Sequence, residues 1–336
     1  MQVVVRNWRC IEHASFELEK VNVFVGQNAT GKSSLAYALY FFSRASRADV
    51  NSTLKSLYGV GIRDVVRFHG KKPQYPVEIR VGKNTLKIDE VLAEPEKFES
   101  PWKDEFLLSS GRLAYFKVTR VLQKLFDEIK ADDKFTVSFI YGFKSLIEKL
   151  IFPPASLFLS DLNKILTGYR IGPLKGDLKT LGRYIVRISP LLTLLSFTLR
   201  DPFTNLELPA ELAPDGQVDQ MLIDLFLERA ERSSLVVVEE PEVYKNPLFQ
   251  IEMARKMFRT AVKRNLTLVV TTHSEIIPLA IGKFVEAGEL KSKDVKIYYF
   301  ERSGKSPWTR LRMIKVYEDG TLDELPDSEK TTASLF

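Results

Sequence analysis

Short apolar runs and period-two alternation characterise the N-terminal part of the chain. Three such segments lie at 2–8, 13–19 and 21–25. Two more, 76–81 and 85–88, flank a Gly-Lys-Asn turn. β-Branched runs and alternating positions predict strands, and turn residues between two such runs predict a hairpin. We therefore expect three early strands followed by a β-hairpin.

The hydrophobic period changes near residue 101. Helical spacing is shown by Val118, Val121, Leu122, Leu125, Phe126 and Ile129, and again by Phe143, Leu146, Ile147 and Leu150. Apolar residues at positions i, i+3, i+4 and i+7 predict amphipathic helices. Further helices are expected over 157–167 and 181–199. Residues 101–200 are thus interpreted as a mainly helical insert.

The pattern returns to alternating helices and strands after residue 200. Helices are expected over 217–232, 246–264 and 275–287, and apolar strands over 235–239 and 267–271. Such alternation is typical of a parallel sheet covered on both faces. The sequence predicts an α/β fold whose head domain is built from residues 1–100 and 201–336, with residues 101–200 inserted between the two parts.

A phosphate-binding loop is the most informative chemical feature. The pattern G-x-x-x-x-G-K-[ST] is filled by Gly26, Gly31, Lys32 and Ser33, between an apolar strand and a helix-like stretch. Glycines let backbone N–H groups approach phosphate oxygens, the lysine supplies a compact positive charge, and the serine hydroxyl is suited to Mg²⁺. The following helix adds its N-terminal partial charge. The remaining predicted nucleotide-binding residues of this loop are Gln27, Asn28, Ala29, Thr30 and Ser34.

Paired carboxylates follow the apolar run 235–238. Glu239 and Glu240 are placed at the carboxyl edge of the predicted sheet, where the phosphate-binding loop also opens. Glu239 is assigned to the Mg²⁺ shell. Glu240 is assigned to orienting and deprotonating the water that attacks the γ-phosphate. Ordinary surface acids after a strand are the alternative explanation.

A third element follows the strand at 267–271. His273 emerges at its carboxyl end, and an imidazole there can hydrogen-bond a terminal phosphate oxygen or the attacking water. We assign His273 to catalysis beside Glu240 and Lys32. A satisfied structural histidine is the alternative.

The order of these motifs resembles that of ABC-type ATPases of the RecF/SMC/OLD branch, particularly prokaryotic OLD-like AAA ATPases. The segments that carry the resemblance are Asn7-Trp8-Arg9 through Asn28, Glu239-Glu240-Pro241-Glu242 with Pro247, Thr272-His273-Ser274, Gly288-Glu289-Leu290 through Phe300, and Glu318-Asp319-Gly320. The resemblance implies an ABC-like P-loop head that uses ATP and Mg²⁺ and closes as a homodimer around nucleotide. It also implies that a Toprim nuclease, for which 336 residues leave no space, would be a separate effector polypeptide.

In that family a signature loop of one head caps the γ-phosphate bound by the other. The matching nucleotide-binding residues here are Asp215, Gly216 and Gln217. Pro214 stands where the family has serine, so one hydroxyl is missing. The family glutamine that follows the metal has only Gln74 and Gln123 as candidates.

Composition and charge narrow the classes of protein. A single cysteine excludes an intramolecular disulfide and a cysteine-built zinc site. The absence of a long apolar run or a leader predicts a cytoplasmic protein without membrane contact. Residues 101–200 carry 16 basic and 9 acidic side chains, against 18 and 23 in residues 201–336. A basic insert could follow a DNA backbone, and solvated helix faces are the alternative.

Three other functions stay open. A transporter ATPase subunit would share these motifs, although the basic insert and the C-terminal strands, which the resemblance implies for the segments from Gly288 to Phe300 and from Glu318 to Gly320, disfavour it. A small-molecule P-loop kinase does not need the Glu239-Glu240 pair or His273. A nucleotide-dependent switch that does not hydrolyse ATP is the strongest alternative, because Pro214 and Glu239 both depart from the usual residues.

Overall fold

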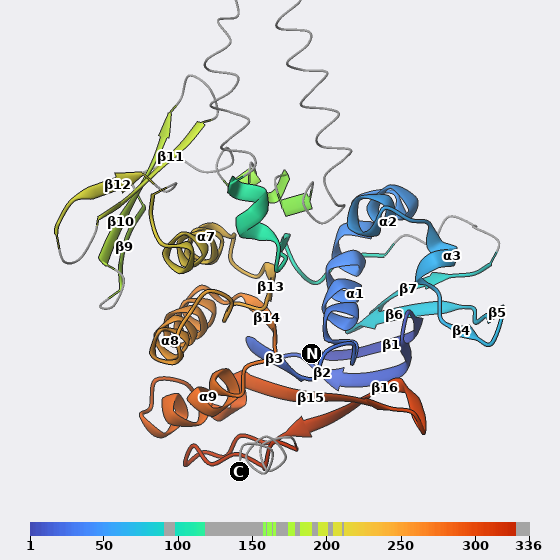
Figure 1. The fold of residues 1–336 in the computed structure, drawn as a ribbon. Helices are drawn as coiled ribbons and strands as arrows, with labels where there is room; N and C mark the ends of the chain where they lie inside the picture. The colour runs from blue at the N-terminus through green and yellow to red at the C-terminus, as the bar shows by residue number, and fades with distance from the viewer. Residues whose placement is uncertain are drawn as a thin grey trace, which may run out of the picture.

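A six-stranded mixed sheet forms the centre of the molecule (Figure 1). The computed structural model describes residues 1–90, 98–117, 157–158, 160–162, 164–165, 174–178, 182–189, 194–200, 204–209 and 212–326. The sheet order is β16 (Ser306–Ile314), β15 (Val295–Ser303), β3 (Val21–Gly26), β14 (Thr267–Thr272), β13 (Leu235–Glu239) and β8 (Glu105–Leu108). All neighbours are parallel except β16, which runs antiparallel to β15.

Helices cover both faces of this sheet (Figure 1). One face packs against α7 (Asp215–Arg229), α8 (Pro247–Arg264) and α9 (Ile276–Glu286), and the other against α1 (Lys32–Ala45). In β13, Val236 and Val238 join the core under α7 to α9, whereas Val237 joins the core around α1. The strands are apolar on both sides because both sides are buried, as the predicted continuous runs require.

A smaller antiparallel sheet, built from N-terminal strands, packs against α1. Its order is β2 (Ile11–Glu17), β1 (Gln2–Trp8), β6 (Val77–Val81) and β7 (Asn84–Ile88). Trp8 is fully buried, stacks on Phe41 of α1 with ring centroids 5.1 Å apart, and donates its indole N–H to the Ser34 carbonyl at 2.9 Å. The predicted early strands and hairpin are confirmed. The short elements after α1 are α2 (Val50–Tyr58), α3 (Ile62–Val65), β4 (Phe68–His69) and β5 (Lys72–Pro73).

A second antiparallel sheet lies beside α7 (Figure 1). It contains β9 (Leu174–Leu178), β10 (Gly182–Ser189), β11 (Leu194–Arg200) and β12 (Glu207–Pro209). The helix expected over 181–199 is therefore wrong. Residues 184–188 are rich in aromatic and β-branched side chains, which favour strands, and Pro190 interrupts any helix through this segment. Of the other helices expected in the insert, residues 118–150 lie outside the described residues, and the described positions of 157–165 are helical.

Strand β8 is one part of the central sheet that the sequence did not predict. Its buried acid, Glu105, accepts hydrogen bonds from Ser43 at 2.8 Å and from Arg44 at 3.1 Å, both on α1. The fully buried Asp161 accepts from the Leu107 backbone N–H and from the Tyr40 hydroxyl, each at 3.2 Å. These partners are distant in sequence. The sequence of β8 alone therefore shows only a short segment that contains an acid, and it does not indicate a strand of the core.

The last elements complete the edge of the head. A 3-10 turn, η1 (Ser292–Asp294), leads into β15, and the hairpin of β15 and β16 runs back along the N-terminal sheet. The described helices include none that is both long and apolar enough to cross a bilayer. The predicted α/β class with a mainly parallel sheet and N-terminal antiparallel strands is confirmed.

Candidate nucleotide-binding site

The phosphate-binding loop joins β3 to α1 and is shaped by close neighbours from the C-terminal hairpin. Gly26 has φ 142°, and a Cβ there would lie 2.4 Å from the Phe300 carbonyl oxygen. Gly31 has φ 104°, and a Cβ there would lie 2.3 Å from the Thr309 hydroxyl. Both positions therefore require glycine for backbone conformation and for space.

Lys32 is directed back over this loop. Its ammonium group donates to the carbonyls of Gly26 and Gln27, each at 2.7 Å, and lies 3.3 Å from His273 Nδ1. Burial lowers the pKa of Lys32 to about 8, and the nearby carboxylates Glu240, Glu242 and Glu239 oppose that shift. The lysine is thus a largely buried cation beside the three acids.

The two strand-end carboxylates occupy different environments. Glu239 is 5% exposed, and its Oε2 accepts from the Tyr37 hydroxyl at 2.6 Å and from the Ser110 backbone N–H at 3.4 Å. Burial, and next the Glu239 charge, raises the pKa of Tyr37 well above its ordinary value, so this phenol stays a donor. Glu240, with φ 43°, turns into the cavity, and its Oε1 lies 3.6 Å from His273 Nε2.

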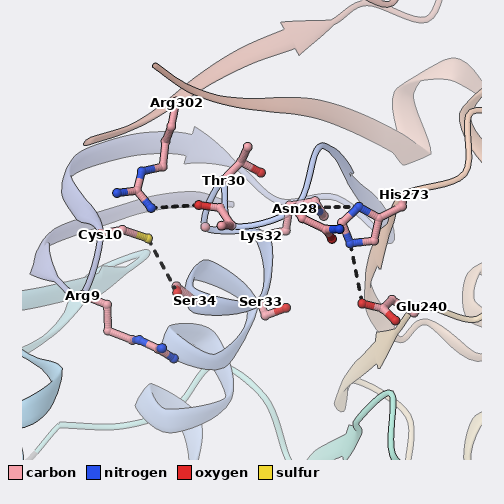
Figure 2. Close-up of a pocket in the computed structure, with 12 residues that line it drawn as sticks. Arg9, Cys10, Asn28, Thr30, Lys32, Ser33, Ser34, Glu240, His273 and Arg302 are labelled. Carbon is pink, nitrogen blue, oxygen red and sulfur yellow. Dashed lines mark hydrogen bonds and ion pairs between the residues drawn. The ribbon is translucent and has the colours of Figure 1, made fainter. Parts of the chain in front are cut away.

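His273 lies between the lysine and the carboxylate (Figure 2). Its backbone N–H donates to Glu242 Oε1 at 2.8 Å, which fixes the start of the loop after β14. The fold thus brings the three predicted catalytic residues, Lys32, Glu240 and His273, from three different strand ends to one place. This is the arrangement that the shared carboxyl edge of parallel strands produces.

A cavity of about 420 Å³ opens over these groups (Figure 2). It is lined by Arg9, Cys10, Asn28, Ala29, Thr30, Gly31, Lys32, Ser33, Ser34, Glu240, His273 and Arg302. Gly26 and Gln27 line a smaller neighbouring cavity with Glu275. Most predicted loop residues therefore face one space.

Three lining residues were missed from the sequence. Arg9 and Cys10 come from the turn between β1 and β2, and Arg302 comes from β15. Arg9 and Cys10 lie in the segment from Asn7 to Asn28 that carries the family resemblance, but no motif assigned them or Arg302 to the nucleotide. They reach the loop because the N-terminal sheet and the C-terminal hairpin flank it, which is a property of the topology rather than of any local pattern.

The signature-like turn does not join this cavity. Pro214 is the N-cap of α7 and gives no side-chain cap, and Asp215 forms an ion pair with Lys117. Gly216 is buried, and a Cβ there would lie 2.5 Å from the Tyr244 carbonyl oxygen. Within one chain, Gly216 therefore packs against the backbone of Tyr244, in the segment that follows the carboxylates.

A buried ionic network links that turn to the strand-end acids. Arg112 Nε and Lys245 Nζ both pair with Asp219 of α7, and the three side chains are at most 2% exposed. Arg112 also donates to the Glu239 carbonyl at 2.6 Å. The residues after β8, the strand next to β13, are Ser109, Ser110, Gly111 and Arg112. No glutamine is placed there: Gln74 lies on the β5 side, bonded to the Lys72 carbonyl at 3.1 Å, and Gln123 is outside the described residues.

The residues present suit Mg²⁺ held together with a nucleotide. Mg²⁺ usually takes one or two protein oxygens, with water and phosphate oxygens completing its six ligands. Ser33 and Glu240 both line the cavity, whereas Glu239 is not among its lining residues and accepts a hydrogen bond from the Tyr37 hydroxyl. The described residues contain no group of three acidic, histidine or cysteine side chains that would hold a metal alone.

Comparison with known proteins agrees with this fold. Residues 1–110 match the AAA ATPase domain family. The Smc head domain with an extended coiled coil, bound to the C-terminal domain of ScpA and derived from Pyrococcus furiosus, is similar with a TM-score of 0.53 and 10% identity, over 99% of this chain and 98% of that chain. An Smc head bound to the C-winged helix domain of ScpA gives a TM-score of 0.53 and 12% identity, over 94% and 98%. No curated protein matches the chain.

These similarities define the class of fold. The head is a P-loop NTPase fold of the kind found in SMC heads, as the resemblance implied. The OLD-like branch stays a prediction.

Proposed function

We propose that this chain is a Mg²⁺-dependent ATPase that hydrolyses ATP to ADP and phosphate. The observation that carries the proposal is the convergence of Lys32, Glu240 and His273 beside the phosphate-binding loop. Lys32 Nζ lies 3.3 Å from His273 Nδ1, and Glu240 Oε1 lies 3.6 Å from His273 Nε2. The match of residues 1–110 to the AAA ATPase domain supports the same conclusion.

The phosphates are held by the loop from residue 26 to 34 and by Lys32. Ser33 and Glu239 would hold Mg²⁺, directly or through water, and the ion would neutralise charge on the β- and γ-phosphates. Tyr37 keeps the Glu239 carboxylate in place through its 2.6 Å hydrogen bond. The side chain of Glu239, which is one methylene longer than the aspartate usual at this position, is thereby fixed in one place.

Glu240 orients and deprotonates the attacking water. Its positive φ directs the carboxylate into the cavity beside His273. Holding a non-glycine residue in this conformation costs about 1–3 kcal/mol, a strain that concentrates at functional sites. His273, which also lies near Lys32, contacts the terminal phosphate or the water.

Two heads close around ATP in the proposed working form. The surface beside the signature-like turn carries exposed apolar side chains, with Tyr244 58%, Leu248 71% and Leu212 71% exposed. Exposed apolar residues grouped next to a site are typical of interaction surfaces. Asp215, Gly216 and Gln217 of one head would then approach the γ-phosphate held by the other.

Closure of the heads is proposed to act on DNA or on a separate effector protein through the segment 101–200, in the manner of a repair or defence ATPase. The basic excess of that segment favours DNA. The single cysteine fits a cytoplasmic setting.

Steady-state hydrolysis by the full chain and by Glu240→Gln tests the proposal. The wild type should turn over ATP only with Mg²⁺, and Glu240→Gln should still bind ATP while turnover falls by about 100-fold or more, since a general base contributes that much. Light scattering should find a dimer of Glu240→Gln with ATP. The exposed Glu318→Gln is the matched control and should behave as wild type.

A nucleotide switch that binds without hydrolysing is the second candidate. It is favoured by Pro214 at the N-cap of α7 and by the engagement of Glu239 with Tyr37. Tight Mg²⁺-dependent ATP binding to wild type without turnover, alone or with added double-stranded DNA, would establish this candidate and contradict hydrolysis. Normal hydrolysis by Glu240→Gln would instead refute the assignment of the base.

A further inference from the structure

The nucleotide cavity has two chemically different ends (Figure 2). Glu240 and His273 stand at one end beside Lys32. In phosphate-binding loops the lysine reaches the β- and γ-phosphates, so the terminal phosphate belongs at this end. The nucleoside therefore leaves toward the other end, which is formed by Arg9, Cys10 and Arg302.

Among the described residues, none of those that line the cavity is a phenylalanine, a tyrosine or a tryptophan. The planar groups at the nucleoside end are the guanidinium groups of Arg9 and Arg302. The Arg9 guanidinium lies over the Tyr58 ring, 4.8 Å from its centroid, so one of its faces is already covered. Within the part of the chain that the structure describes, no ring covers the Arg302 guanidinium.

Arg302 is held firmly at the rim of the loop. Its Nε donates to the Pro307 carbonyl at 2.7 Å, and its Nη1 donates to the Ala29 carbonyl at 2.8 Å (Figure 2). Two bonds in the plane of a guanidinium fix that plane and leave its faces open. Arginine presents such a face to aromatic ring systems, which lysine cannot do.

We infer that Arg302 is a nucleoside-binding residue whose guanidinium face supports the base of a purine nucleoside triphosphate. The inference rests on the proposed function, because it assumes that phosphates occupy the loop. Stacking on a guanidinium is stronger for the larger ring system of a purine than for a pyrimidine. It makes no contact with the hydrogen-bonding edge of the base. The site thus selects purines and discriminates adenine from guanine only weakly.

The contact with Ala29 gives Arg302 a second effect that the experiment must separate. Ala29 has φ 58°, so loss of the hydrogen bond could also relax the phosphate-binding loop. Thr309 does not line the cavity; its hydroxyl supports the same loop through a 2.9 Å bond to the Thr30 carbonyl and lies 3.3 Å from Cys10 Sγ. A Thr309→Val variant is therefore a control for loop support alone.

Binding of ATP and of inorganic tripolyphosphate, each with Mg²⁺, separates the two effects. For Arg302→Ala we expect the Kd of ATP to rise about tenfold, as expected for losing one stacked cation, and the Kd of tripolyphosphate to stay unchanged. Thr309→Val should weaken both ligands in parallel. Arg310→Ala on the same hairpin, away from the cavity, should change neither.

Each of the following outcomes would overturn the inference. Equal weakening of ATP and tripolyphosphate by Arg302→Ala would make the residue a loop support only. Unchanged ATP binding, or full restoration by Arg302→Lys, would exclude a planar platform. If wild type bound tripolyphosphate and ATP equally well, no nucleoside site would exist, although the phosphate site would stand. If it bound neither ligand, the proposed function itself would fail.

Discussion

The phosphate-binding loop and the signature-like turn at the start of α7 are both glycine-bearing segments at a helix start, yet the chain uses them differently. Gly26 and Gly31 shape a loop that faces an open cavity with Lys32. Gly216 is buried against the Tyr244 carbonyl, and its helix is tied down through Asp219. The first segment is built to receive a ligand, whereas the second is anchored to its own chain.

This difference explains how far the function of each motif could be predicted from the sequence. The chemistry of the loop is performed by its own backbone and by Lys32, so the local pattern predicts it. The proposed role of the turn depends on a second head. Its residues must also satisfy packing within the chain, and that packing accounts for Gly216 independently of any phosphate.

The largest expected effect comes from the ionic network under the turn. In Asp219→Ala, the buried cations Arg112 and Lys245 lose their shared partner, and we expect the free energy of unfolding to fall by about 3–5 kcal/mol. Urea denaturation at neutral pH measures this loss. The result would confirm that the turn is a structural anchor.

Lys245→Met provides the contrast. It removes one of two cations that share a single carboxylate, and a well-packed apolar side chain there should change stability by no more than about 1 kcal/mol, with either sign. Similar, small effects of both variants would mean that the network does not anchor α7. The signature-like turn would then not differ from the phosphate-binding loop in the way described above.

A smaller effect is expected for Gly216→Ala. Alanine is the better helix former, so only the approach of its Cβ to the Tyr244 carbonyl can destabilise the protein, by about 1–3 kcal/mol as for other overpacked sites. Gly304→Ala in the β15–β16 hairpin is the control, because among the described residues, apart from its chain neighbours, no atom lies within 4 Å of the added carbon. A stable Gly216→Ala that lost only turnover would favour a role in contacting nucleotide across a dimer.

The fold was predictable where hydrophobic periods are long and local. The strands at 21–26, 235–239 and 267–272 follow from continuous apolar runs. Strand β8 did not, because its acid is satisfied by Arg44 on α1, which no local pattern reveals. The helix expected over 181–199 is wrong because residues 184–188 are rich in aromatic and β-branched side chains, which favour a strand.

The candidate site was predictable to the same extent. Lys32, Glu240 and His273 follow strands whose carboxyl ends meet, so their convergence could be expected. Tyr37 and Arg112, which hold Glu239 by its side chain and its carbonyl, could not. Their partners are distant in sequence, and only the packed structure brings them together.

Nucleotide affinity should also depend on pH through Lys32, whose pKa burial lowers to about 8. The phosphates need the protonated ammonium, so above pH 8 the free protein must take up a proton when it binds. The Kd of MgATP should then be constant below pH 8 and rise by up to about tenfold per pH unit above it. Below pH 8 the lysine is already charged, and no such dependence is expected.

Calorimetric titration of MgATP into wild type and Lys32→Ala at pH 7 and pH 9 tests the central claim most directly. We predict binding to wild type that weakens at pH 9, and loss of about 100-fold or more in affinity for Lys32→Ala at pH 7, as removal of a buried charge-assisted phosphate contact implies. Lys283→Ala, at an exposed ion pair, should match wild type. Equal MgATP affinity of wild type and a folded Lys32→Ala would contradict the account.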